Sequence, residues 1–200
     1  MRIIVATGNA GKLAEYERLL GGVPDVQLES MASLAESVHV VEDGDTFYAN
    51  ALKKARAVAS VAGVPSMADD SGLEVDALAG RPGVHSARYA GSDTTDAQNN
   101  EKLLRELSSV SDDGRTARFR CTIVLVDGEG RELLVAEGAC EGRIVTSARG
   151  AHGFGYDPLF VADGYEQTMA ELSPEKKNEI SHRAKAAAKL VAGLCELQQP

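Results

Sequence analysis

Short hydrophobic runs alternate with amphipathic segments in the first part of the chain. The uninterrupted run Ile3–Ala6 predicts a buried strand. A helix should follow it, because Leu13, Tyr16 and Leu20 recur at helical spacing on one face. A second strand is expected around 26–28. Alternation of strand and helix is typical of an α/β domain.

The most regular helical pattern comes next. Hydrophobic residues recur at helical spacing over four turns, at Phe47, Ala51, Ala55, Val58 and Ala62. The acidic loop 42–46 offers an N-cap before this helix, and Gly63 and Pro65 should end it. The strand-like segment Ser66–Ala68 then leads into Asp69–Gly72.

The second half predicts one more helix and a set of hairpins. A helix is expected over Asp96–Leu107, with its leucines inward. The segment Thr116–Val126 alternates between hydrophobic and polar positions, which predicts a long half-buried strand. The turn sequence Asp127–Gly130 should return the chain into Leu133–Ala136, and Arg143–Thr146 predicts a further strand. The last helix is expected to bury one stripe, formed by Ile180, Ala184, Ala188, Val191 and Cys195. Together these elements predict an α/β domain with a mixed central β-sheet flanked by helices.

Composition and charge narrow the function classes. The 200 residues carry a formal charge of −9 and 4% aromatic residues without tryptophan, so a general nucleic-acid surface is disfavoured. A few local cations or a metal can still attract a small anion within one cleft. Cys121, Cys140 and Cys195 are odd in number and widely spaced, which indicates free thiols rather than disulfides.

Targeting signals are not evident. The longest uncharged stretch, 57–68, has 12 residues, whereas a membrane span needs about 20. The apolar run at the N-terminus is too short for a signal-peptide core. We therefore expect a soluble cytoplasmic protein with no membrane partner.

The segment Thr7–Lys12 is a candidate anion site. A strand, a glycine-containing loop and a helix start would point backbone N–H groups at a phosphate, and Lys12 adds a cation. The spacing G-x-x-G-K differs from a Walker A loop. An ordinary turn with a solvated lysine explains these residues about as well.

Asp69 and Asp70 are candidate metal ligands. Adjacent carboxylates repel each other, and Mg²⁺, which takes one or two carboxylates together with substrate phosphates, would relieve that repulsion. Their side chains point to opposite faces if the segment is a strand, so one of them would be the direct ligand. The local sequence by itself favours a polar turn. Glu42 could add a carboxylate, and Asn50 and Lys54 would share a helix face, although such a face is more often simply solvated.

Two further segments carry polar chemistry near the C-terminus. In one continuous helix Lys177 and His182 would point about 140° apart, so joint use requires a break at Ser181. The glycine-rich run Gly150–Pro158 contains two aromatic rings and an aspartate. It is either a purine pocket or a tight corner.

These segments, in this order, resemble the inosine/xanthosine triphosphate pyrophosphatase family, the Ham1-like, RdgB-type enzymes. The resemblance covers nearly the whole chain and is strongest at TGNAGK (7–12), ADDSGLEVDAL (68–78), PGVHSARYAG (82–91), GFGYDP (153–158) and SHRAKA (181–186). It implies a single domain over 1–200 with an active-site cleft between two lobes. It also implies a homodimer that uses Mg²⁺ to hydrolyse ITP, dITP and XTP to the monophosphate and pyrophosphate.

The resemblance also assigns roles to individual residues. Asp70 would be the general base and, with Glu42, would bind Mg²⁺. Substrate would be bound by Thr7, Gly8, Asn9, Ala10, Gly11, Lys12, Asn50, Lys54, Ser71, Phe154, Gly155, Tyr156, Asp157, Lys177, His182 and Arg183. Ala49 departs from the family pattern, which often has a glutamate there, and Asp43 or Asp45 could compensate.

Two other function classes fit the same pocket. A non-catalytic purine-nucleotide sensor or interaction module would bind without turnover, but binding alone does not need carboxylates beside phosphates. A phosphotransferase is disfavoured by the absence of a Walker serine or threonine.

Overall fold

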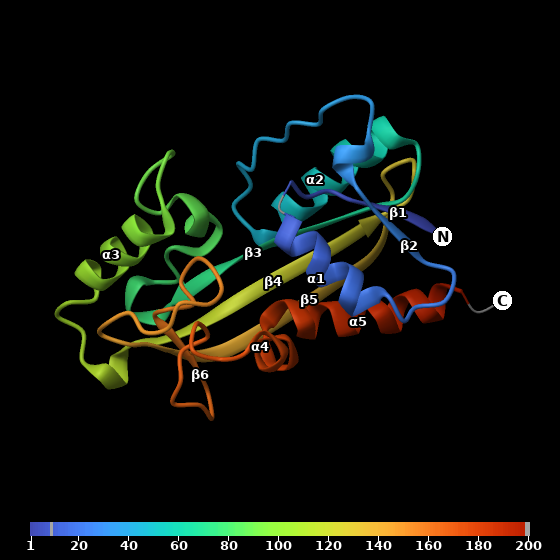
Figure 1. Cartoon of the computed structure of the whole chain (residues 1–200). Helices are drawn as coiled ribbons and strands as arrows, with labels where there is room; N and C mark the ends of the chain where they lie inside the picture. The colour runs from blue at the N-terminus through green and yellow to red at the C-terminus, as the bar shows by residue number, and fades with distance from the viewer. Residues whose placement is uncertain (9, 199–200) are drawn as a thin grey trace. The chain divides into compact units, whose positions relative to one another are not determined.

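The computed structural model describes residues 1–8 and 10–198, and its elements follow the predicted order (Figure 1). The strands are β1 (Arg2–Val5), β2 (Gln27–Ser30), β3 (Ser66–Val75), β4 (Thr116–Val126), β5 (Glu132–Ile144) and β6 (Phe160–Ala162). The helices are α1 (Ala10–Leu20), α2 (Phe47–Ala62), α3 (Asp96–Glu106), α4 (Pro174–Ile180) and α5 (His182–Leu197). Short 3₁₀ turns cover 31–33, 76–78, 83–88 and 112–114.

The described strands form one mixed sheet in the order β2-β1-β3-β4-β5-β6. β1 pairs in parallel with β2 and with β3, with Val5 opposite Met67 in the second pair. β5 pairs antiparallel with β6. The predicted α/β class with a mixed sheet is therefore confirmed.

The chain divides into two compact units whose boundaries fall inside secondary-structure elements. Unit 1 comprises Met1–Asp70, Cys121–Gly138 and Ala184–Pro200, and unit 2 comprises Ser71–Arg120 and Ala139–Arg183. One boundary lies in β3, between Asp70 and Ser71. The expected cleft between two lobes stays a prediction.

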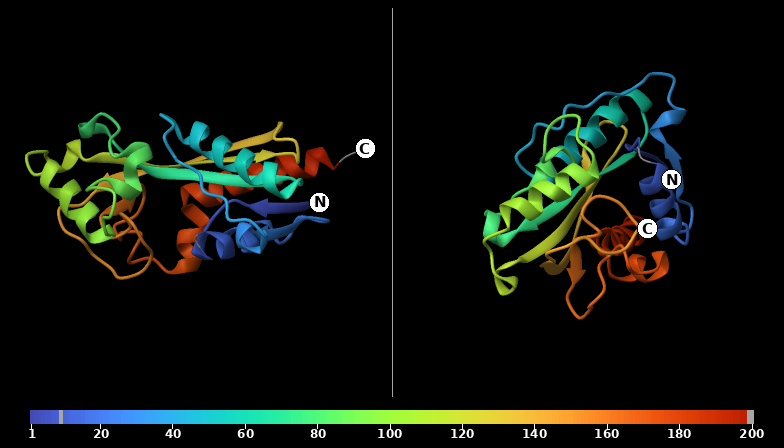
Figure 2. Two further views of the ribbon diagram at one scale, coloured as in Figure 1. Left: turned by 90° about the horizontal axis from the view of Figure 1, so that it is seen from above. Right: turned by 60° about the vertical axis from the view of Figure 1, so that its left-hand side comes forward.

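Unit 1 has hydrophobic cores on both faces of its strands. Ile3 and Val5 belong to a cluster with α1 and α5, whereas Ile4 and Ala6 belong to one with α2. Successive strand residues point to opposite faces, so the uninterrupted run at 3–6 serves both cores. Figure 2 shows α2 on one side of these strands and α1 and α5 on the other.

Unit 2 has a core of its own. It joins Leu103 of α3 and Leu107, which caps that helix, to Phe119 of β4 and Phe160 of β6, whose rings lie 4.7 Å apart. The buried Arg115 donates to the carbonyl of Leu107 at 2.7 Å. That carbonyl also accepts from the Val110 N–H at 3.0 Å, so Arg115 holds the segment that follows α3.

The predicted hydrophobic stripe of the last helix is wrong. Ser181 has extended backbone angles and separates α4 from α5, so it resets the phase of the helix. Ala188 and Cys195 are exposed, and the buried hydrophobic positions are Ala186, Ala187, Leu190 and Leu194. The break that joint use of Lys177 and His182 required is present.

Two strand predictions also change. Arg143–Thr146 is not a separate strand, because the pairing of Gly142 with Ala162 of β6 keeps β5 regular as far as Ile144. β4 has the predicted bounds, but it is half-buried only in its first half. In its second half Val124 and Val126 pack into the α2 cluster, which covers the face expected to be polar.

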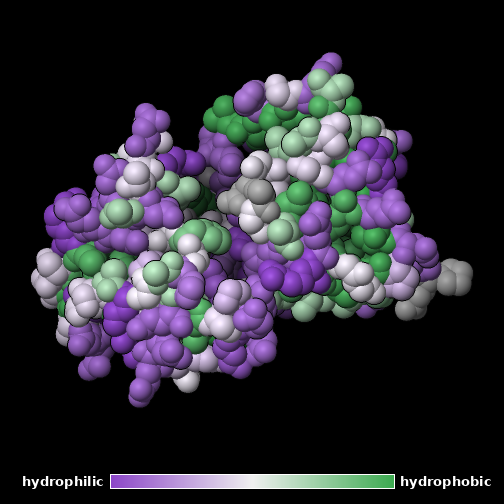
Figure 3. Space-filling view, viewed as in Figure 1, coloured by the Kyte–Doolittle hydropathy of each residue, from purple (hydrophilic) through white to green (hydrophobic). Residues whose placement is uncertain are grey.

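The surface is mostly hydrophilic on the face that Figure 3 presents. None of the described helices is long and apolar enough to cross a membrane. Large exposed hydrophobic side chains in the described residues are scattered along the chain, the most exposed being Val41 and Phe154.

Candidate active site

Asp69 and Asp70 lie inside β3, not in the turn that the local sequence favoured. The Asp69 carboxylate pairs with Lys12 of α1 at 2.8 Å. The Asp70 carboxylate accepts a hydrogen bond from the Asn50 amide of α2 at 3.0 Å. Because α1 and α2 cover opposite faces of the strands, the two carboxylates point to opposite faces, as predicted.

A polar cluster forms around Asp70. The Lys54 ammonium lies 2.8 Å from Glu42 and 3.8 Å from the Asp70 carboxylate, so it bridges both. Asn50 is fully buried, and its amide oxygen accepts from the Gly44 N–H at 2.8 Å. That bond turns the Asn50 N–H group towards Asp70. Asn50 and Lys54, one helical turn apart, therefore face this polar cluster and not solvent.

The first turn of α2 fixes where the helix begins and therefore which of its side chains face the cluster. The loop 42–46 was predicted to offer an N-cap, and the cap is Thr46, whose hydroxyl accepts from the Ala49 N–H at 3.1 Å. Phe47 is buried beneath the first turn. Asn50 and Lys54 follow on the face that meets β3.

Burial raises the pKa of the Asp70 carboxyl above its ordinary value. The positive charge of Lys54 and the Asn50 hydrogen bond act in the opposite direction, while the negative charge of Glu42 raises the pKa further. Burial therefore disfavours the ionised form of Asp70, and a further positive charge beside the carboxylate would stabilise that form.

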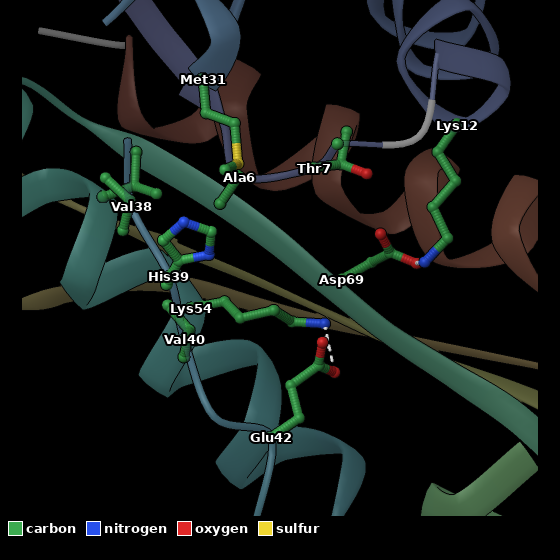
Figure 4. A pocket seen from close by; sticks show the side chains of 12 residues that line it. Ala6, Thr7, Lys12, Met31, Val38, His39, Val40, Glu42, Lys54 and Asp69 are labelled. Atoms are coloured by element: carbon green, nitrogen blue, oxygen red, sulfur yellow. Dashed lines mark hydrogen bonds and ion pairs between the residues drawn. The ribbon is translucent and has the colours of Figure 1, made fainter. Parts of the chain in front are cut away.

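The polar cluster opens into a cavity of about 370 Å³ in unit 1. Figure 4 shows Lys12 beside Asp69 and Lys54 beside Glu42, with an apolar wall that includes Met31. Thr7 and Gly8, from the predicted anion loop, also line it. The cavity thus combines lysines, carboxylates and an apolar wall.

His39 lines the same cavity and was missed by sequence analysis. A single histidine in a loop has neither periodicity nor ligand spacing to single it out. Figure 4 shows its ring near the aliphatic part of Lys54.

The predicted loop 7–12 is partly described. Thr7 and Gly8 follow β1, and Gly11 and Lys12 belong to the first turn of α1, which has no acidic residue. Ala10 begins that helix. Asn9 lies outside the described residues. A helix start without a nearby carboxylate in its own first turn suits an anion.

The donor set fits one small, hard cation. Among the described residues no group of three or more His, Cys, Asp or Glu side chains gathers to hold a metal. Asp43 pairs with Lys53 at 2.6 Å and both Asp43 and Asp45 are exposed, so compensation for Ala49 by either residue stays a prediction. Glu42 and Asp70 remain as the carboxylate pair, and Mg²⁺ takes one or two carboxylates with substrate oxygens.

The remaining predicted residues form a second group in unit 2. The Arg183 guanidinium donates to the Ser71 hydroxyl at 3.3 Å and lies 5.9 Å from the centre of the Phe154 ring. The Lys177 ammonium lies 4.8 Å from the same ring and also pairs with Asp157. Two cations thus lie close to one exposed aromatic ring.

His182 is held by an aromatic neighbour. Its imidazole stacks on Phe119 with ring centres 5.0 Å apart and planes 15° from parallel. It is 8% exposed and is the first residue of α5, directly after the break at Ser181.

The two aromatic rings of the predicted purine pocket, Phe154 and Tyr156, do not both face a ligand. Tyr156 is buried in the unit 2 core, and its hydroxyl donates to the Ser86 carbonyl at 2.8 Å. Burial also raises the pKa of Tyr156. Phe154 is 52% exposed, so it is the ring of this loop that a ligand can reach. Gly153 has a φ of 82°, and a side chain there would overlap the Asp157 carboxylate.

Comparison with known proteins agrees with this geometry. The chain is 51% identical over 189 residues to a dITP/XTP pyrophosphatase of Desulforamulus reducens, covering 94% of this chain and 93% of that protein. It is 50% identical over 188 residues to a dITP/XTP pyrophosphatase of Geobacillus kaustophilus, covering 94% and 91%.

The chain is also similar to solved structures of Ham1 proteins. A HAM1 protein from Coxiella burnetii matches with a TM-score of 0.91 and 40% identity, covering 98% of this chain and 99% of that one. The Staphylococcus aureus Ham1 protein matches with a TM-score of 0.90 and 38% identity, covering 99% and 100%. The model of the Ham1 family matches residues 3–193, so the chain belongs to the Ham1 family.

Proposed function

We propose that the chain is a Mg²⁺-dependent pyrophosphohydrolase that converts non-canonical purine nucleoside triphosphates, namely ITP, dITP and XTP, to the monophosphate and pyrophosphate. The observation that carries the proposal is the convergence of Glu42 and Asp70 on Lys54, beside a cavity that Glu42, Lys54 and Lys12 line. The names of the relatives support the substrate class.

Glu42 and Asp70 would hold the Mg²⁺. When bound, this ion supplies positive charge that polarises a phosphoryl oxygen. The raised pKa of Asp70 and its repulsion by Glu42 both favour a cation between them.

Asp70 is the general base in this proposal. Its carboxylate takes a proton from the water that attacks the α-phosphorus, the bond to the bridging α–β oxygen breaks, and pyrophosphate leaves. Lys12 and Lys54 offset negative charge on the phosphates. The Asn50 hydrogen bond orients the Asp70 carboxylate for this transfer.

The unit 2 group would bind the base and sugar end. Phe154 offers a stacking face, and Arg183 or a backbone N–H would donate to the 6-keto oxygen of hypoxanthine or xanthine, where adenine has a donor instead. Ser71 accepts a hydrogen bond from Arg183 within this group. Asp157, Lys177 and His182 complete this group.

The direct test is turnover of dITP, XTP, dGTP and dATP side by side with Mg²⁺. We expect pyrophosphate and monophosphate in equal amounts from dITP and XTP, and much slower release from dATP. A nucleotide-binding module would bind dITP without releasing pyrophosphate. Release of orthophosphate with a nucleoside diphosphate would contradict cleavage at the α–β position.

Glu42→Gln should raise the Mg²⁺ concentration needed for half-maximal turnover of dITP by about tenfold or more, since one charged ligand is lost. The measurement is a Mg²⁺ titration of the initial rate. Asp43→Asn makes the same chemical change at the next residue, in an exposed carboxylate paired with Lys53, and should leave the titration unchanged. Equal titrations for Glu42→Gln and the parent would remove Glu42 from the metal site.

A second copy of the chain is the proposed partner, because the resemblance implies a homodimer. Sedimentation equilibrium checks the oligomeric state, and a mass equal to that of one chain at micromolar concentration would contradict it.

A further inference from the structure

Helix α3 holds both backbone groups of Gly155. The Asp96 carboxylate accepts from the Gly155 N–H at 2.6 Å, and the Asn100 amide donates to the Gly155 carbonyl at 3.0 Å. Asp96 and Asn100 are four residues apart, so they share one face of α3. Neither residue belongs to the motifs singled out in the sequence.

The residues around Gly155 are held as well. The Phe154 N–H donates to Asp157 at 2.9 Å, and the Tyr156 hydroxyl is bonded to Ser86. Gly155 itself has a φ of 62°, a left-handed conformation that glycine adopts without strain. The backbone of this loop is thus held by hydrogen bonds within unit 2, whereas the Phe154 ring itself is half exposed.

The ring of Phe154 depends on this backbone for its position. It is 52% exposed, and its neighbours include the Lys177 and Arg183 cations, 4.8 Å and 5.9 Å from its centre. A displacement of the backbone at 154–155 would carry the ring away from both cations.

Asn100 shows a feature that stability alone does not explain. Its amide oxygen is buried and has no hydrogen-bond partner among the described residues. A buried acceptor without a partner destabilises a folded protein, whereas a leucine at this helical position would avoid that cost. The useful part of the side chain is therefore the N–H group that reaches Gly155.

We propose that Asp96 and Asn100 are positioning residues that set affinity for the purine base by holding Gly155 and, through it, the Phe154 ring. This inference rests on the proposed function, because it assigns the base end of the substrate to Phe154. It adds two residues of α3 to the determinants of that site.

The test uses Asp96→Ala, Asn100→Leu and the control Glu101→Gln on the full chain. Glu101 is an exposed carboxylate on the same helix, with Arg105 4.0 Å away. We expect KM for dITP to rise about five- to tenfold in each of the first two variants, as for loss of one hydrogen bond, with kcat within about twofold. Inorganic tripolyphosphate, which lacks a base, should inhibit all variants and the parent with the same Ki.

A second readout needs no substrate. Hydrogen–deuterium exchange of the peptide covering 150–158 should be faster in Asp96→Ala and Asn100→Leu and unchanged in Glu101→Gln. Melting temperature is measured in parallel, and Asn100→Leu should not lower it.

The outcomes separate the possibilities. Unchanged KM for dITP, or equal rises in KM and in the tripolyphosphate Ki, would overturn the positioning role. Unchanged hydrogen–deuterium exchange at 150–158 would show that Asp96 and Asn100 do not hold the backbone of this loop. Absence of dITP hydrolysis by the parent protein would refute the proposed function instead, while the exchange experiment would still decide whether α3 holds the loop.

Discussion

Asp70→Asn should slow pyrophosphate release from dITP by about 10²–10⁴-fold, the usual cost of removing a general base. It should leave the folded protein as stable as the parent or more stable. The asparagine oxygen can still accept the Asn50 hydrogen bond that now reaches Asp70. Single-turnover rates of dITP hydrolysis and thermal unfolding of the metal-free protein provide the two measurements.

The sign of the stability effect follows from the pKa of Asp70. Burial raises that pKa, so the folded protein binds the proton more tightly than the unfolded chain. The ionised carboxylate therefore lowers the stability of the metal-free fold as the pH rises above the pKa of the unfolded state. An asparagine removes this loss at neutral pH, a trade of stability against activity that is common at active sites.

Asp163→Asn serves as the control for this prediction. It changes an exposed aspartate and should alter neither rate nor melting temperature. Near-parental turnover by Asp70→Asn would refute Asp70 as base and as metal ligand together. A large fall in melting temperature would show instead that Asp70 supports the fold.

Lys12→Met should lower the free energy of unfolding by about 3 kcal/mol, because it removes the cation 2.8 Å from a buried carboxylate. The Asp69 side chain is only 2% exposed, so water cannot solvate the carboxylate once the lysine is removed. The double variant Lys12→Met with Asp69→Asn should recover most of the stability, since no buried charge then lacks its partner. It should not recover turnover of dITP, because the cation for the phosphates is still absent.

Urea unfolding of the single and double variants measures the first effect, and dITP kinetics measure the second. Lys53→Met is the control: Lys53 and Asp43 are both largely exposed, so solvent screens the pair and its loss should change stability much less. Recovery of both stability and turnover in the double variant would remove Lys12 from the phosphate site. Equal losses in Lys12→Met and Lys53→Met would contradict a special role for the buried pair.

Several elements could be predicted from the chain because their signals are local. The helix Phe47–Ala62 has regular hydrophobic spacing, a threonine cap and a glycine stop, and each of these acts within one turn of the backbone. The strand Thr116–Val126 has a clear alternation and was predicted with its bounds. The last helix was not, since a break at Ser181 shifts every later residue to a different face.

The candidate site also combines features that local sequence determined with features that only the tertiary structure decided. Local sequence determined which residues carry charge, which helix presents Asn50 and Lys54 on one face, and that Ser181 had to interrupt a helix for Lys177 and His182 to act together. Only the tertiary structure decided that Asp69 and Asp70 lie within a strand and meet lysines from different helices. It also placed Tyr156 in a core and Gly155 against α3. The physical reason is distance along the chain: periodicity reports neighbours within a turn or two, whereas Lys12 and Asp69 are 57 positions apart and meet only when strands pair and helices pack.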